Sequence, residues 1–142
     1  MPIKFAVIKE RKSPPDKRVV LTPKSCQTLI KNHPQAQLVV ESSQIRAFLD
    51  DEYSELGIQV ANDISDADVM IGVKEVPIEA LIPNKSYFFF SHTIKKQPYN
   101  RKLLQAVLDK NITLYDHETL VDKKHNRIIG FGYYAGVVGA YK

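Results

Sequence analysis

The sequence predicts an α/β domain built on an open, mostly parallel β-sheet with helices on both faces. Short apolar runs alternate with helical patterns along almost the whole chain, and this alternation is typical of parallel or mixed sheets. Right-handed crossovers between parallel strands place the connecting helices on both faces. The length of 142 residues and a hydrophobic content of 44% suit a single domain with a packed core.

The first half of the chain begins with a predicted strand, Ile3–Ile8, which is apolar and stops at charged residues. A polar loop containing Pro14 and Pro15 follows, and consecutive prolines exclude a helix there. Thr22 is a favourable N-cap, and Pro23 suits the first helical position, so we expect a helix up to Asn32. The next predicted elements are a strand Gln37–Glu41, short helices Gln44–Leu49 and Asp51–Leu56, and a strand Ile58–Ala61.

The second half contains two continuous apolar runs, Val69–Val73 and Tyr87–Ser91, which we interpret as buried strands. A short helix Ile78–Ile82 separates them. A longer helix is expected to begin at Pro98 and to reach Lys110. Its predicted buried face, from the helical spacing of the apolar residues, consists of Leu103, Leu104, Val107 and Leu108. The remaining predictions are a strand Ile112–Tyr115, a hairpin Thr119–Ile129 and the start of a helix in Gly130–Lys142.

Composition and charge exclude several classes of protein. The formal net charge is +4, and basic residues are interspersed with acids rather than clustered as in nucleic-acid-binding proteins; we therefore expect no nucleic-acid partner. A single cysteine, Cys26, cannot form a disulfide within the chain and is compatible with a reducing cytoplasm. No apolar run approaches the roughly 20 residues that span a bilayer. We expect a cytoplasmic protein with no membrane association.

Charged side chains follow the predicted strands at the points where these strands end. Lys74 follows one buried strand and His92 follows the next, while Arg18 lies in the loop after the first strand. In an open α/β sheet, ligands bind beyond the carboxyl ends of the strands. Arginine binds carboxylates through two parallel hydrogen bonds, and histidine exchanges protons near neutral pH. The pattern indicates a pocket for a substrate that carries carboxylates, although a single charged residue at a strand end is more often merely solvated.

Other candidate sites are weaker. His117 and Glu118 also follow a predicted strand. A metal site requires three or four converging ligands, and no spacing of cysteine and histidine suggests one, so we expect no metal. The glycines Gly130, Gly132 and Gly136 depart from the dinucleotide fingerprint, because aromatic residues occupy positions that should be small. Close helix packing explains these glycines better. The predicted sheet is thus Rossmann-like or flavodoxin-like without its own dinucleotide fingerprint.

Several motifs resemble those of the superfamily of alanine dehydrogenase, transhydrogenase and saccharopine dehydrogenase. They occur in the order that the superfamily shows and cover nearly the whole chain. The segments that carry the resemblance are Lys9-Glu10 with Lys17–Pro23, then Val73–Pro77, Phe90–Asn100, Leu114–Glu118 and Arg127–Gly136. The third to fifth of these are most similar to the branch of saccharopine dehydrogenase and lysine–oxoglutarate reductase.

The resemblance implies roles for individual residues. Lys74 and His92 match the family's acid–base pair, and Arg18 matches the arginine that binds a substrate carboxylate. Glu118 matches an acid that moderates the charge of the catalytic lysine. Two further positions in the loop after His92 match possible substrate contacts, namely Lys95 and Gln97. The implied reaction joins lysine to 2-oxoglutarate to give saccharopine, or the reverse, by hydride transfer to or from an imine.

The resemblance also implies a domain organisation. Residues 1–142 form the substrate domain, and in the family a nicotinamide-binding domain for NAD or NADP follows it. No such domain lies in this chain, so we expect these residues alone to bind no cofactor and to be inactive. They belong either to a longer enzyme, which we favour, or to a free-standing remnant. We also expect an exposed apolar surface that favours self-association into a homo-oligomer.

Two alternatives to a saccharopine dehydrogenase-like oxidoreductase of lysine metabolism remain open. One is a domain of the alanine dehydrogenase or transhydrogenase type. The other is a non-catalytic module that binds an amino acid or a keto acid. The direction of the reaction and the choice between NAD and NADP depend on residues outside these motifs.

Overall fold

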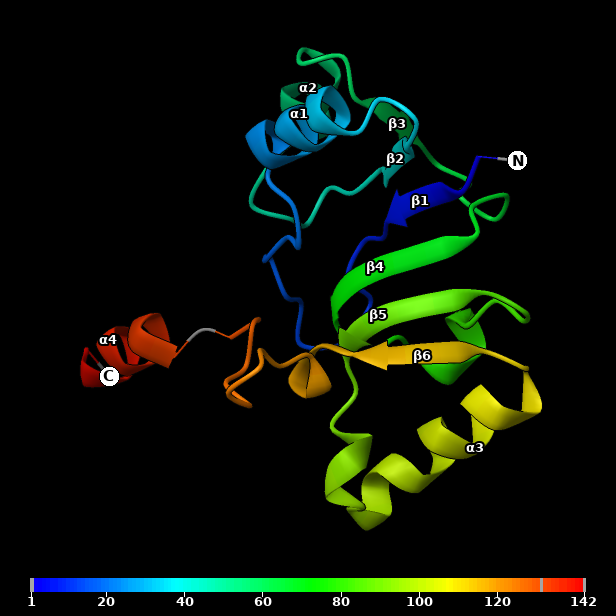
Figure 1. The fold of residues 1–142 in the computed structure, drawn as a ribbon, viewed down its shortest axis with the longest axis vertical. Helices are drawn as coiled ribbons and strands as arrows, with labels where there is room; N and C mark the ends of the chain where they lie inside the picture. The colour runs from blue at the N-terminus through cyan, green and yellow to red at the C-terminus, as the bar shows by residue number, and fades with distance from the viewer. Residues whose placement is uncertain (1, 131, 142) are drawn as a thin grey trace.

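The computed structural model describes residues 2–130 and 132–141, and its centre is a six-stranded, fully parallel β-sheet (Figure 1). The strands are β1 (Lys4–Val7), β2 (Gln37–Glu41), β3 (Gln59–Ala61), β4 (Val69–Lys74), β5 (Ser86–Phe90) and β6 (Thr113–Asp116). Their order in the sheet is β3-β2-β1-β4-β5-β6, which is that of doubly wound Rossmann folds. The predicted fold class is confirmed.

The described residues contain four α-helices and four short 3₁₀ turns. The α-helices are α1 (Pro23–Asn32), α2 (Asp50–Ser54), α3 (Arg101–Asp109) and α4 (Gly132–Ala140). The 3₁₀ turns are η1 (Ile78–Ala80), η2 (Thr93–Lys95), η3 (Pro98–Asn100) and η4 (His117–Thr119). Helix α1 begins as the sequence predicts, because the Thr22 hydroxyl accepts a hydrogen bond from the Ser25 backbone N–H at 3.2 Å.

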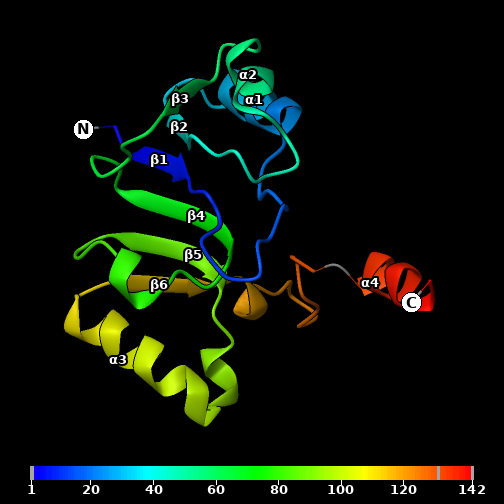
Figure 2. The ribbon, with the colours of Figure 1, turned by 180° about the vertical axis from the view of Figure 1, so that it is seen from behind.

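Helices cover the two faces of the sheet unequally. On one face, α1 and α2 contribute Cys26 and Tyr53 to a core with the strand residues Val7, Leu38 and Val40. On the opposite face, a larger core joins α3 to the strands; it contains Leu103, Ala106 and Val107 of the helix and Ala6, Val39, Met70, Tyr87 and Phe89 of the sheet. Figures 1 and 2 show α1 and α2 beside β1–β3, and α3 beside β5 and β6.

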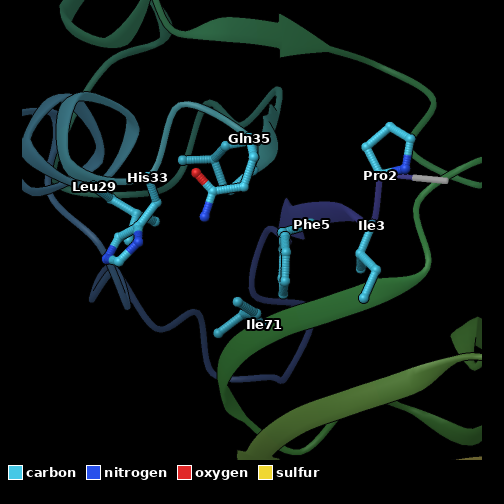
Figure 3. Close-up of a pocket in the computed structure, with 9 residues that line it drawn as sticks. Pro2, Ile3, Phe5, Leu29, His33, Gln35 and Ile71 are labelled. Carbon is cyan, nitrogen blue, oxygen red and sulfur yellow. The ribbon is translucent and has the colours of Figure 1, made fainter.

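The face that carries α1 and α2 is bare over β4–β6. Phe88 and Tyr115 stack on it with ring centroids 4.5 Å apart, and Tyr115 stays 44% exposed. Where the bare area meets α1, a largely apolar cavity of about 540 Å³ opens. Figure 3 shows Leu29 of α1 and His33, which follows α1, on one side of this cavity and Phe5 and Ile71 of the strands on the other.

Two expectations about helices were wrong. The segment Gln44–Leu49 is a series of bends rather than a helix, because the buried Arg46 guanidinium donates to the backbone oxygens of Glu41 and Phe48. These bonds hold the segment in an irregular path. In α3, Leu103 and Val107 are buried as expected, but Leu104 and Leu108 are 42% and 67% exposed. The helix is therefore rotated relative to the predicted apolar stripe, and Ala106 packs inward instead.

The last part of the chain is the least packed. The expected hairpin is reduced to one antiparallel bridge between Val121 and Arg127. Helix α4 lies apart from the sheet in both views, on the side of the carboxyl ends of the strands (Figures 1 and 2). An added Cβ at Gly132 or Gly136 would meet nothing within 4 Å, so close packing does not explain these glycines among the described residues. Phe131 and Lys142, part of the predicted helical segment, lie outside the described residues. No helix that the structure describes is long and apolar enough to cross a membrane.

Candidate functional site

The candidate site lies at the edge of the sheet where the strands end. Because β1, β4, β5 and β6 are parallel neighbours, the residues that follow them share one edge. Lys74 is the last residue of β4, and His92 follows β5 after Ser91. The pairing of β4 and β5 is irregular between Ile71 and Lys74. The prediction that these strands are adjacent and end on the same side is confirmed.

Glu10 anchors the strand end that carries Lys74. Its carboxylate accepts the backbone N–H groups of Val73 at 2.7 Å and of Lys74 at 2.9 Å. Burial raises the pKa of Glu10 above its ordinary value, although these two hydrogen bonds oppose the shift. In the sequence, Glu10 belongs to the first of the resembling motifs, and no role was predicted for it. These two hydrogen bonds join the loop after β1 to the end of β4.

Arg18 lies in the loop between β1 and α1 and is oriented by Asp16. The Arg18 Nε donates to Asp16 Oδ1 at 3.0 Å, and its Nη2 donates to Oδ2 at 2.6 Å. This two-point hydrogen bond lowers the pKa of Asp16 and raises that of Arg18. The charge of Lys74 also lowers the pKa of Asp16. The charge of Arg18 likewise acts to lower the pKa of Glu10, against the larger effect of burial. Arg18 and Lys74 therefore belong to one electrostatic cluster.

His92 and Glu118 form the second cluster of the site. The His92 Nδ1 lies 3.2 Å from Glu118 Oε2. Because a carboxylate only accepts, Nδ1 is the donor, and this leaves Nε2 of a neutral imidazole with its lone pair available. Glu118 is buried, whereas the His92 side chain is 34% exposed. The pair thus presents a solvent-accessible proton acceptor that rests on a buried carboxylate.

Two cations complete the surroundings of Glu118. Arg127 Nη2 lies 2.6 Å and Lys95 Nζ lies 3.5 Å from Glu118 Oε1. Burial alone would raise the pKa of Glu118, but the hydrogen bond from His92 and the charges of Lys95 and Arg127 lower it below its ordinary value. Glu118 is therefore a carboxylate at neutral pH, and it holds three potentially positive groups together.

The backbone of His92 has an unusual conformation. His92 adopts a left-handed conformation with φ 58°, and so does Lys96 with φ 51°. Residues other than glycine rarely adopt this region, and such conformations are common at functional sites. The buried Asn100 supports the turn by donating from its side-chain amide to the His92 carbonyl oxygen at 3.2 Å. No sequence pattern indicated this conformation.

The structure brings some of the predicted residues together and not others. Lys95 joins the His92–Glu118 cluster. Gln97 is exposed and lines a separate cavity of about 340 Å³ with Thr93 and Arg101. Within residues 2–130 and 132–141, no hydrogen bond or ion pair joins Lys74 to His92 or to Glu118. The charged partners of Glu118 in this part of the chain are His92, Lys95 and Arg127.

The walls of a cavity of about 300 Å³ include Val19, Val73 and Phe90. Along the chain, these residues are close neighbours of Arg18, Lys74 and His92. The buried His117 also lines the cavity, and His117 Nε2 donates to the Gly72 carbonyl oxygen at 2.9 Å. The lining is mainly apolar.

Sequence reasoning missed Glu10, Asp16 and Arg127 as members of the site. Arg127 follows a polar turn whose only described strand contact is an isolated bridge, so no periodicity pointed to it. Asp16 lies two residues before Arg18 in an irregular loop. Only for Asp16 was a signal available, namely its charge two positions before the chosen Arg18.

The residues that are present do not fit a dinucleotide. The connection from β1 to α1, residues 8–22, contains no glycine, although a dinucleotide fold needs glycines there for close approach of the pyrophosphate. The Thr22 side chain already caps the N-terminus of α1. The glycines near α4 face open space and form no cradle. Within the described residues, no group of three or more histidine, cysteine or acidic side chains is placed to hold a metal ion.

Comparison with known proteins identifies relatives of the chain. It is 40% identical over 124 residues to the mitochondrial alpha-aminoadipic semialdehyde synthase of Rattus norvegicus, covering 87% of this chain and 13% of the relative. It is 31% identical over 144 residues to the NAD(+), L-lysine-forming saccharopine dehydrogenase of Yarrowia lipolytica, covering 98% of this chain and 38% of the relative. The chain thus spans only a minor part of these relatives.

Solved structures agree with the observed fold. An L-alanine dehydrogenase superposes with a TM-score of 0.69 at 22% identity, over 87% of this chain and 35% of that one. At this identity the likeness supports the fold alone. The alanine dehydrogenase/PNT N-terminal domain family matches residues 6–138, which is nearly the whole chain. The protein belongs to the alanine dehydrogenase/PNT N-terminal domain family.

Proposed function

We propose that residues 1–142 are the substrate-binding and acid–base part of a saccharopine dehydrogenase-like oxidoreductase. In this proposal the complete enzyme interconverts saccharopine with lysine and 2-oxoglutarate. The domain that binds NAD or NADP lies outside these residues, and the 142-residue chain alone is inactive. The proposal rests on relatives whose names include saccharopine dehydrogenase and alpha-aminoadipic semialdehyde synthase.

The observation that carries the proposal is the His92–Glu118 pair with its surrounding cations. An imidazole that donates from Nδ1 to a buried carboxylate has a fixed tautomer and orientation, as a general base or acid requires. Arg127 and Lys95 are bound to the same carboxylate, yet their side chains stay 57% and 52% exposed. They can therefore meet the carboxylates of a substrate that approaches His92.

In this proposal, individual residues of the chain have separate roles. Arg18, held by Asp16, binds one substrate carboxylate. Lys95 and Arg127 bind another, and Gln97 contacts the substrate from the same loop. His92 Nε2 takes a proton from, or gives one to, the secondary amine of the substrate. Lys74 exchanges the second proton at the carbon–nitrogen centre where water enters or leaves.

The test is a cofactor-oxidation assay on the complete encoded protein with lysine, 2-oxoglutarate and reduced nicotinamide cofactor. The proposal predicts oxidation that requires both substrates. Omitting lysine is the internal control, because a 2-oxoglutarate reductase without a lysine site would still oxidise the cofactor. Absence of oxidation above background with either NADH or NADPH contradicts the proposal.

The same assay separates the alternatives. A domain of the alanine dehydrogenase type predicts oxidation with ammonia and pyruvate, and the likeness to an L-alanine dehydrogenase structure makes this comparison necessary. A non-catalytic binding module predicts no oxidation with any pair of substrates, but binding of an amino acid or keto acid by calorimetry.

A further inference from the structure

A buried carboxylate outside the predicted site connects the two strands that carry His92 and Glu118. Asp116 is the last residue of β6 and is only 7% exposed. Its Oδ2 accepts hydrogen bonds from the backbone N–H of Ser91, at 3.3 Å, and from the Ser91 hydroxyl. Its Oδ1 accepts the backbone N–H of Glu118 at 2.9 Å. One side chain thus bonds to the residue before His92 and to the backbone of Glu118.

These bonds bear on the geometry of the pair. Ser91 is fully buried and ends the extended part of the chain before the left-handed His92. Its hydroxyl also accepts the Thr93 backbone N–H at 3.2 Å, so the bonds of Ser91 extend across the turn that contains His92. In η4, which follows β6, the bond to the Glu118 N–H sets the direction in which the Glu118 side chain leaves the backbone.

We propose that Asp116 is a positioning residue for the acid–base pair: by bonding to Ser91 and to Glu118, it fixes the separation of the His92 imidazole and the Glu118 carboxylate. The proposal deepens the proposed function and rests on it for the catalytic consequence. Asp116 acts through the hydroxyl and backbone of Ser91 and through the backbone of Glu118.

A direct electrostatic role of Asp116 would shift the pKa of Glu118 in the opposite direction from a positioning role when Asp116 is replaced. If Asp116 acted only as a second negative charge near Glu118, its neutralisation would make the Glu118 carboxylate easier to ionise. If it acts by positioning, its removal lets the His92–Glu118 hydrogen bond lengthen and makes Glu118 harder to ionise. The titratable groups that face Glu118 are His92, Lys95 of η2, and Arg127 after β6, and Asp116 itself is bonded to its backbone.

The experiment measures the pKa of the Glu118 carboxyl by carbon-detected NMR in the wild type and in two variants, Asp116→Asn and Ser91→Ala. In Asp116→Asn, positioning predicts that the pKa of Glu118 rises toward the ordinary value of a glutamate. In Ser91→Ala, which keeps the Asp116 charge but removes the hydrogen bonds of the Ser91 hydroxyl to Asp116 and to Thr93, it predicts a smaller rise. A fall or no change in Asp116→Asn contradicts the proposal. If Asp116→Asn fails to fold, the Ser91→Ala result decides in the same way.

The chain offers a control at Asp50, the first residue of α2. Asp50 accepts hydrogen bonds from the Ser42 hydroxyl at 2.5 Å and from the Ser43 backbone N–H at 3.1 Å, much as Asp116 accepts from Ser91. Asp50→Asn should lower stability without changing the Glu118 pKa. An equal change in both variants would show a general loss of structure and would contradict positioning.

Turnover of the complete enzyme separates this proposal from the proposed function. Asp116→Asn should lower kcat at least about tenfold with a smaller change in KM, whereas Asp50→Asn should leave both near wild type. If the enzyme has no lysine–oxoglutarate activity, the proposed function fails. The NMR measurement of the Glu118 pKa still tests the positioning role of Asp116 independently of that activity.

Discussion

Glu10 and Glu118 are glutamates at the same edge of the sheet, and their pKa values shift in opposite directions. Glu10 is half-buried and bonds to neutral backbone amides, so desolvation dominates and raises its pKa. Glu118 is buried, but its partners carry or can carry positive charge, and together they lower its pKa. The nature of the partners, rather than burial alone, decides which carboxylate stays ionised.

The lowered pKa of Glu118 predicts a pH dependence of stability. The ordinary value is 4.5, and the folded value lies below it, so the unfolded chain binds a proton at a higher pH than the folded one. The stabilisation is complete above the ordinary value and is lost as the pH falls through the folded value. Urea unfolding should show Glu118→Gln less stable than wild type near neutral pH and the difference shrinking in acid.

The exposed Glu55 provides the control for this measurement. Glu55→Gln should change the free energy of unfolding little at any pH, because surface substitutions usually have small effects. A gap between wild type and Glu118→Gln that widens as the pH falls would contradict the assigned direction of the shift.

Lys74 and His92 carry the proposed proton transfers. Lys74→Met and His92→Gln in the complete enzyme should each lower turnover at least about tenfold, as loss of a general acid or base does. Steady-state kinetics measures this, with exposed Lys31→Met as a control that should match wild type. Unchanged rates in both site variants would show that neither group takes part in the chemistry.

Residue-level prediction from the sequence reached as far as the strand ends. Lys74, His92 and Arg18 were identified because parallel strands end at one edge, and that geometry follows from the strand pattern. The anchors of the site were not, since Glu10 and Asp116 act through hydrogen bonds to backbone N–H groups. Such bonds depend on the irregular pairing of β4 and β5 and on turns, which leave no periodic signal.

At the scale of elements, Gly72 in β4 allows the close approach of the first strand to the site. A Cβ at this position would lie 3.0 Å from Ile8 Cγ1 and 3.3 Å from Glu10 Oε1. Gly72→Ala should therefore lower the free energy of unfolding by about 1–3 kcal/mol, as overpacking does, and disturb the Glu10 bonds to Val73 and Lys74. Thermal or urea unfolding measures the loss.

Gly130→Ala is the matched control, because a Cβ there meets nothing within 4 Å. We expect its stability to remain within about 0.5 kcal/mol of wild type. Equal effects of the two substitutions would show that the close contact at Gly72 does not limit the packing.

Elements were predictable where a local rule and the tertiary structure agree. The bounds Pro23–Asn32 and Gln37–Glu41 match the observed α1 and β2, since capping chemistry and a continuous apolar run specify them. The helix expected at Gln44–Leu49 does not form, because the bonds of the buried Arg46 guanidinium to the carbonyls of Glu41 and Phe48 outweigh a weak helical preference. Propensity carries no information about such a buried side chain.

At the scale of the whole molecule, half of one sheet face is uncovered. The area includes Phe88, Tyr115 and the cavity beside Ile3 and Phe5, and α4 adds exposed tyrosines and valines. The α/β pattern predicted the fold class but not the order of the strands, since helical crossovers between parallel strands allow more than one order. The asymmetry of the helix coverage was not predictable, because no helix connects β3 to β4.

The bare face predicts self-association of the 142-residue chain. Sedimentation velocity should show a concentration-dependent increase in mass, which Ile3→Lys, at a position 54% exposed beside the cavity, should reduce. Leu108→Lys, at a position 67% exposed on α3, is the control and should leave the association unchanged. A monomer at all concentrations would contradict the role of this face.

Binding of saccharopine to the chain, measured by isothermal calorimetry, tests the central claim most directly, because it needs neither the cofactor nor turnover. The account predicts binding that Arg18→Ala weakens about tenfold or more, the effect of losing a charged hydrogen bond, while Lys31→Ala leaves it unchanged. Binding that is absent, or that is equally strong in Arg18→Ala, would contradict the assignment of this sheet edge as a site for substrate carboxylates.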